Sequence, residues 1–327
     1  MTKLKKLIVS GIAVVLAVSL TACNVDIQSD ALSDNSTDTS AVKTGYSVIS
    51  TISDVTETTL TIDSVCAAVL VDNDGKVIDC KIDQAHIKPN LTQNNGDVAD
   101  LRTKFEKQED YGLRSASAIQ KEWYEQISAF EDFTKGKTAD EIINSVDENG
   151  YVSDTDLKAS CTIKVSDISQ AVANAIGSAQ YLGASETDIL RLAVSTQKNN
   201  SASSDTNLQY DSYYAAVTLN SDGIITSCLI DASQAKCTIA DGMFTVSDCD
   251  FATKKELKED YGMKGASQIG KEWYEQAGAF EEFAKGKTAA EITAVVGNDG
   301  YSSDADLSAG CTIDISPIVS NLVNAMA

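Results

Sequence analysis

Two stretches of seven residues carry the side chains best suited to chemistry. Residues 156–162 have the sequence Asp-Leu-Lys-Ala-Ser-Cys-Thr, and residues 306–312 have the sequence Asp-Leu-Ser-Ala-Gly-Cys-Thr. Each stretch offers a carboxylate, a thiol and a hydroxyl, and a hydroxyl can act as a nucleophile or as a point of covalent attachment. The structural alternative is a connection of small residues with the aspartate in a turn, leading into a strand at residues 162–165.

The rest of the composition excludes several classes of protein. The chain has a single histidine, His86, which excludes metal sites with several histidine ligands and disfavours a serine hydrolase with a histidine base. No Cys-x-x-Cys occurs among the eight cysteines, which disfavours zinc ribbons and thioredoxin-like pairs. The formal net charge of −22 repels phosphates, so nucleic acid is not an expected partner.

The two stretches belong to a duplicated unit. Residues 111–143 align without a gap to residues 261–293, with 22 of 33 positions identical. A period near 150 residues indicates two whole domains in tandem, which we place at residues 44–183 and 184–327 and expect to fold independently. Functional residues are expected in both copies. His86 has a glutamine as its counterpart, so we interpret it as a surface or turn residue.

Within each copy, strands are expected first and helices after them. In the first copy, residues 65–71 and 76–82 are apolar, β-branched runs around an Asp-Asn-Asp-Gly turn, which predicts a β-hairpin. The apolar residues that follow recur at helical spacing on one face: Ala116, Ile119, Trp123, Ile127 and Phe130. The predicted fold class is therefore α+β for both copies.

Capping residues mark two further helices in each copy. Thr138 and Glu141 form a capping box that predicts a short helix, and the same pair recurs 150 residues later. A last helix is expected after Ser166 in the first copy and from Ser316, followed by proline, in the second copy. Helical periodicity also favours a core position for the two tryptophans.

The cysteines predict few disulfides. If Cys23 is modified, seven cysteines remain, and an odd number leaves at least one unpaired in a monomer. Cys80 matches Cys228, and both are expected to be buried in strands. Cys237 and Cys249 occur in the second copy alone, where a local disulfide between them is one open possibility.

The start of the chain is predicted to be a lipoprotein leader. Residues 1–22 combine three lysines with an apolar run of 14 residues, which is too short to span a membrane and typical of a secretory signal. Residues 20–23, Leu-Thr-Ala-Cys, resemble the bacterial lipobox, although an ordinary signal peptide is the alternative. Lipids on Cys23 and a polar tether over residues 23–43 would hold the protein at the extracytoplasmic face of the cell membrane.

The repeated stretches resemble a motif of a known family. Extracytoplasmic bacterial FMN-binding domains carry Asp-x-x-Ser/Thr-Gly-Ala-Thr/Ser, and a flavin transferase links FMN through its phosphate to the last hydroxyl. Tandem lipoproteins of this type also have the lipobox, an acidic tether and a helix with Trp-x-Glu-Gln, so the resemblance covers nearly all of residues 44–327. It implies these cofactor-binding residues: Thr312, Thr162, Asp306, Asp156, Gly310, Cys311, Cys161, Tyr261, Tyr111, Trp273 and Trp123.

The chain departs from the family motif at three positions. Alanine replaces the first Ser/Thr, cysteine replaces the alanine, and Ser160 replaces the glycine in the first copy, so Thr312 ranks above Thr162 as the attachment residue. The resemblance implies an electron carrier, rather than a stand-alone enzyme, between a membrane quinol-linked donor and external acceptors. The alternative is a non-enzymatic binding or interaction lipoprotein of the same fold that has lost its flavin.

Overall fold

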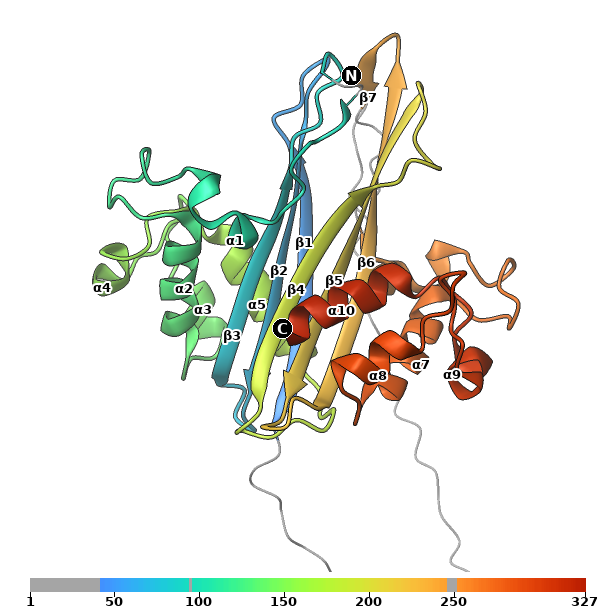
Figure 1. Cartoon of the computed structure of the whole chain (residues 1–327). Helices are drawn as coiled ribbons and strands as arrows, with labels where there is room; N and C mark the ends of the chain where they lie inside the picture. The colour runs from blue at the N-terminus through green and yellow to red at the C-terminus, as the bar shows by residue number, and fades with distance from the viewer. Residues whose placement is uncertain (1–41, 94–95, 246–251) are drawn as a thin grey trace, which may run out of the picture. The chain divides into compact units, whose positions relative to one another are not determined.

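The computed structural model describes residues 42–93, 96–245 and 252–327, which belong to one compact unit. Within these ranges the chain is α+β, as predicted, with two antiparallel sheets and helices (Figure 1). No helix in the described ranges is long and apolar enough to cross a membrane.

The predicted leader lies almost wholly outside the described residues. This applies to the signal peptide at residues 1–22, to the lipidation site Cys23, and to the tether at residues 23–43 except for its last two residues. Those two residues already belong to the fold, because Val42 is buried and Lys43 begins the first strand. The lipid anchor remains a prediction.

Each copy contributes one sheet. The strand order is β1-β2-β3 in the first copy and β4-β5-β6-β7 in the second copy, with antiparallel neighbours throughout. The first sheet consists of β1 (Lys43–Ser53), β2 (Thr61–Val71) and β3 (Val77–Ile87). The second consists of β4 (Ile189–Lys198), β5 (Asn207–Leu219), β6 (Ile225–Ala240) and β7 (Met243–Thr245).

Strands β2 and β3 form the predicted hairpin, and both extend beyond the predicted runs. The Asp72 carboxylate accepts hydrogen bonds from the backbone N–H groups of Asp74 at 2.9 Å and Lys76 at 2.8 Å. Gly75 has a φ of 75°, in the left-handed region that glycine adopts without strain. Cys80 and its counterpart Cys228 are fully buried in strands, as expected.

The helices follow their sheet in each copy. In the first copy they are α1 (Lys104–Lys107), α2 (Trp123–Thr134), α3 (Ala139–Ile143), α4 (Thr155–Lys158) and α5 (Ser166–Ser178). In the second copy they are α6 (Lys254–Leu257), α7 (Trp273–Ala284), α8 (Ala289–Ala294), α9 (Ala305–Gly310) and α10 (Ser316–Met326). Both predicted capping boxes open the short helices α3 and α8.

A core forms between each sheet and its helices. Helix α5 packs on β1 and β2, and α10 packs on β4 and β5, whereas α2 and α7 pack on β3 and β6. Phe130 and Phe280 are fully buried at matching positions in these two cores. Burial of a phenylalanine side chain stabilises a fold by about 1.5–3 kcal/mol, so these cores anchor the helices that carry the candidate site.

Three local predictions were wrong. The long helix begins at Trp123, because the Glu122 carboxylate binds the backbone N–H groups of Leu113 and Arg114 and folds the preceding residues into turns. Residues 162–165 form no strand, since their backbone connects two helices and has no strand partner. His86 lies within β3 rather than in a turn, and its half-buried side chain places Nδ1 2.6 Å from Asp63 Oδ1.

The two sheets share three hydrophobic clusters. One cluster joins Leu60, Ile62 and Ile87 of the first copy to Leu208 and Tyr210 of the second copy, together with further residues of β6 and β7. The other two clusters likewise combine residues of β1, β2 and β3 with residues of β4 and β5. The sheets therefore bury one another's apolar side chains, which weighs against independent folding of each copy.

Candidate functional site

The second copy has a cavity of about 370 Å³ between its sheet and its helices. Three of its walls come from Lys254 at the start of α6, Tyr261 after that helix, and Trp273 at the start of α7. The Lys254 Nζ lies 4.9 Å from the centre of the Tyr261 ring and 5.2 Å from that of Trp273. An ammonium group over two aromatic faces is attracted to both rings. Lys254 thereby places one positive charge in the lining of the cavity.

Thr312 lies at this cavity and is held in place by a buried glutamine. Its backbone N–H donates to Gln276 Oε1 at 2.7 Å, and its hydroxyl donates to the same oxygen at 3.1 Å. The Gln276 Nε2 donates in turn to Ser267 Oγ and to the Lys271 carbonyl, both at 3.1 Å. All polar atoms of the fully buried glutamine are thus used, so the orientation of the threonine hydroxyl is fixed.

A buried carboxylate fixes the loop that contains Ser267. The Glu272 side chain accepts the backbone N–H groups of Met263 at 2.8 Å and Lys264 at 2.9 Å, while its own N–H donates to Glu275. Glu272 is the N-cap of α7, so one residue starts the helix and closes the loop over the cavity.

The first copy has the same arrangement with a smaller cavity of about 270 Å³. The Lys104 Nζ lies 5.3 Å from the centre of the Tyr111 ring and 5.7 Å from that of Trp123. Thr162 donates to Gln126 Oε1 through its N–H at 2.8 Å and its hydroxyl at 3.1 Å. Thr162 does not line this cavity, however, which distinguishes it from Thr312.

The predicted aspartates lie elsewhere. Asp156 and Asp306 are exposed in the first turns of α4 and α9, and neither lines a cavity that contains the aromatic residues. The capping function belongs to Asp154 and Asp304, which precede them by two residues and accept backbone N–H groups of these short helices.

The predicted cysteines and glycine are structural neighbours of the threonines. Cys161 and Cys311 are buried in the cores, and burial raises the pKa of the Cys161 thiol to about 11 and also raises that of Cys311. Neither thiol is therefore poised as a nucleophile at neutral pH. A Cβ on Gly310 would lie 3.0 Å from the Cβ of Ala279, so the small residue permits close packing of α9 on α7.

Sequence reasoning missed the lysine and the glutamine of each site. A usable signal was present, because Gln126 and Gln276 end the repeated Trp-Tyr-Glu-Gln segment, and Lys104 and Lys254 are also 150 residues apart. The predicted disulfide is not tested, since Cys249 lies outside the described residues.

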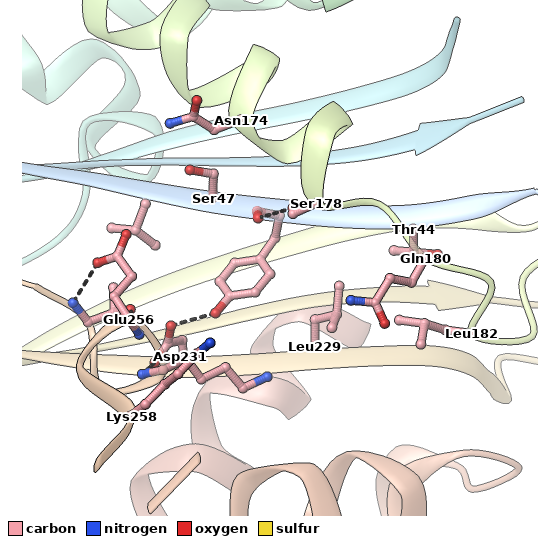
Figure 2. A pocket seen from close by; sticks show the side chains of 14 residues that line it. Thr44, Ser47, Asn174, Ser178, Gln180, Leu182, Leu229, Asp231, Glu256 and Lys258 are labelled. Carbon is pink, nitrogen blue, oxygen red and sulfur yellow. Dashed lines mark hydrogen bonds between the residues drawn. The ribbon is translucent and has the colours of Figure 1, made fainter. Parts of the chain in front are cut away.

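A larger cleft of about 530 Å³ lies where the two copies meet (Figure 2). The Tyr46 hydroxyl of the first copy donates to Asp231 Oδ2 of the second copy at 2.5 Å, and the ammonium of Lys255 pairs with Glu281. Burial raises the pKa of Asp231 and of Tyr46, and their hydrogen bond ties β1 to β6. Because Tyr46 and Asp231 bind one another, we interpret them as a connection between the copies, whereas the pair of Lys255 and Glu281 lies within the second copy.

Comparisons with known proteins give little further information. No family model matches the chain, and no solved structure matches it. A curated protein named chlorophenol reductase, from Desulfitobacterium hafniense, is 55% identical over 40 residues. This segment covers 12% of the present chain and 12% of the reductase, which is too short to place the chain in a family.

Proposed function

We propose that the protein is an extracytoplasmic flavoprotein that carries electrons and holds FMN covalently through a phosphoester on Thr312. The observation that carries this proposal is the position of Thr312, which lines the same cavity as Lys254, Tyr261 and Trp273. A phosphorylated planar ring needs an attachment oxygen, aromatic walls and a compensating cation, and this cavity offers all three. The resemblance in the repeated stretches supports the same assignment.

The residues of the second copy have distinct roles in this proposal. When bound, FMN supplies the redox chemistry, and the protein supplies position and electrostatics. Gln276 holds the Thr312 hydroxyl at the cavity, and the two rings restrict the plane in which a flat ligand fits. Lys254 places an ammonium group beside any negative charge that develops on that ligand.

The first copy fits FMN less well. Its cavity is smaller, Thr162 does not line it, and Ser160 replaces the glycine of the family motif. We therefore propose that FMN is attached to Thr162 more slowly than to Thr312, or that it is not attached there at all. The partners in this proposal are a flavin transferase, a membrane quinol-linked donor and, through lipid on Cys23, the bilayer. The short similarity to a protein named as a reductase is compatible with a redox function.

The experiment is coexpression of the full chain with a flavin transferase, followed by measurement of intact mass. The wild type should gain the mass of FMN less water on Thr312, and the purified protein should be yellow. Thr312→Val keeps the shape of threonine without the oxygen, so it should lose this increment, whereas the exposed Thr187→Val should not. An unmodified wild type beside an active transferase would overturn the proposal and favour the binding or interaction lipoprotein.

A further inference from the structure

The first copy contains a half-buried ammonium group, that of Lys104, without a carboxylate partner. The Lys104 Nζ donates to the neutral Gln84 Oε1 at 2.9 Å, and no carboxylate among the described residues lies within ion-pairing distance of it. The nearby Asp63 carboxylate is bound to His86 and Gln84 instead. Burial lowers the pKa of Lys104 to about 8, so this amine is still mostly protonated at neutral pH.

This ammonium group faces the cavity of the first copy between two aromatic rings. Tyr111 and Trp123 form the walls on which it rests, at 5.3 and 5.7 Å from the ring centres. A second amine, that of Lys164, also lines the cavity, together with one carboxylate, that of Asp167. Two cations and one anion give this cavity a net charge of +1 when the lysines are protonated.

The matching cavity of the second copy differs in charge. Asp314 stands at the position of Lys164, and Pro317 stands at that of Asp167. One cation, Lys254, and one anion then line that cavity, which gives a net charge of zero. A tyrosine and a tryptophan line both cavities at matching positions, but Tyr213 and Tyr301 also line the second cavity, so the two cavities differ in charge and in the extent of their aromatic lining.

We propose that the cavity of the first copy is a reversible binding site for an aromatic anion with one ring, such as a benzoate or a phenolate. The ring would lie against Tyr111 and Trp123, and the negative group would pair with the ammonium groups of Lys104 and Lys164. A volume of about 270 Å³ lies just below the usual range for ligand sites, roughly 300–1,000 Å³, which favours a single ring over a larger ligand. This site does not depend on covalent FMN in the second copy.

The chain provides its own reporters for a test. It has two tryptophans, and each lines one of the two cavities. In full-length Trp273→Phe, tryptophan fluorescence therefore reports on Trp123, and in Trp123→Phe it reports on Trp273. Benzoate is the probe, benzamide is its uncharged planar control, and acetate is the anion without a ring.

Benzoate should change the fluorescence of Trp123 in a saturable way, and benzamide and acetate should bind at least tenfold more weakly. Lys104→Met keeps the aliphatic stem and removes the charge, and Lys164→Asp copies the second cavity at an exposed position. Both substitutions should weaken benzoate binding at least tenfold. Equal binding of benzoate and benzamide, a response confined to Trp273, no saturable response, or unchanged binding by a folded Lys164→Asp variant would each overturn the proposal.

Discussion

The unfolding free energy of the wild type is expected to fall as the pH rises from acidic to neutral. Replacing Asp83 by asparagine should remove a large part of this fall. The Asp83 side chain is 8% exposed, and its Oδ1 accepts the N–H groups of Gln84 at 2.7 Å and Phe105 at 3.2 Å. Burial outweighs these hydrogen bonds and raises the pKa of Asp83 to about 7. The folded chain therefore keeps a proton that the unfolded chain releases. This stabilisation is complete below the unfolded pKa and is lost as the pH rises through 7.

The two pKa values determine the magnitude. The ordinary pKa of aspartate is 3.8, so the folded value is raised by about three units, or about 4 kcal/mol as an upper bound. Between pH 5 and pH 7 the carboxyl is mostly protonated in the folded chain and ionised in the unfolded chain. This interval of about two pH units lowers the unfolding free energy by about 3 kcal/mol. Asparagine keeps an oxygen acceptor for both N–H groups but does not titrate in this range.

Urea unfolding at pH 5 and pH 8 measures this difference. The wild type should lose about 3 kcal/mol more unfolding free energy than Asp83→Asn over this interval. Asp222→Asn, at an exposed turn position, should behave as the wild type does. Burial also raises the pKa of Glu131 to about 7, so Glu131→Gln should change the pH dependence in the same direction. If wild type and Asp83→Asn lose equal stability, the carboxyl is ionised in the folded protein and the reasoning fails.

Three further outcomes are expected. The fragment 184–327 should dimerise or precipitate, because it exposes apolar β4 and β5 surface that the first copy covers, and a monodisperse folded monomer in sedimentation would contradict the shared core. Gln276→Leu should lower the unfolding free energy by about 2–5 kcal/mol, since it leaves two donors of Thr312 without an acceptor. Tyr274→Phe removes only a solvent-exposed hydrogen bond to Glu259, so it should change little in urea unfolding. Cys23→Ala should move the protein from the membrane to the soluble fraction and block palmitate labelling, and an unlabelled wild type would refute lipidation.

Secondary structure was predictable where one signal was strong and local. The hairpin around residues 72–75 followed from a turn between two β-branched runs, and the capping boxes at Thr138 and Thr288 located two short helices. Strand β1 was missed because its sequence, KTGYSVISTIS, mixes apolar residues with serine, threonine and glycine, and it resembles the polar segment before it. Its strand character comes from pairing with β2 along its whole length.

The sheet-to-sheet packing could not be read from the sequence for a different reason. Strand β2 is apolar on both faces, which indicates that both faces are covered but does not say by what. In the structure, helices cover one face and the other copy covers the opposite face. The site was predictable in part, since Thr312 lines the same cavity as Tyr261 and Trp273, whereas Thr162 does not line the cavity of the first copy. The lysines were missed because their importance depends on their position over those rings, which only the tertiary structure provides.

Duplication explains why the two cavities could acquire different charges without loss of the fold. The buried residues that build each site, such as Gln126 and Gln276, are identical in the two copies, because each satisfies several hydrogen bonds at once. Lys164 and Asp314 occupy the same position but are exposed, so exchange of the charge there costs little stability. Selection could therefore change the ligand preference of one copy while the other kept its own, provided that the buried framework stayed intact.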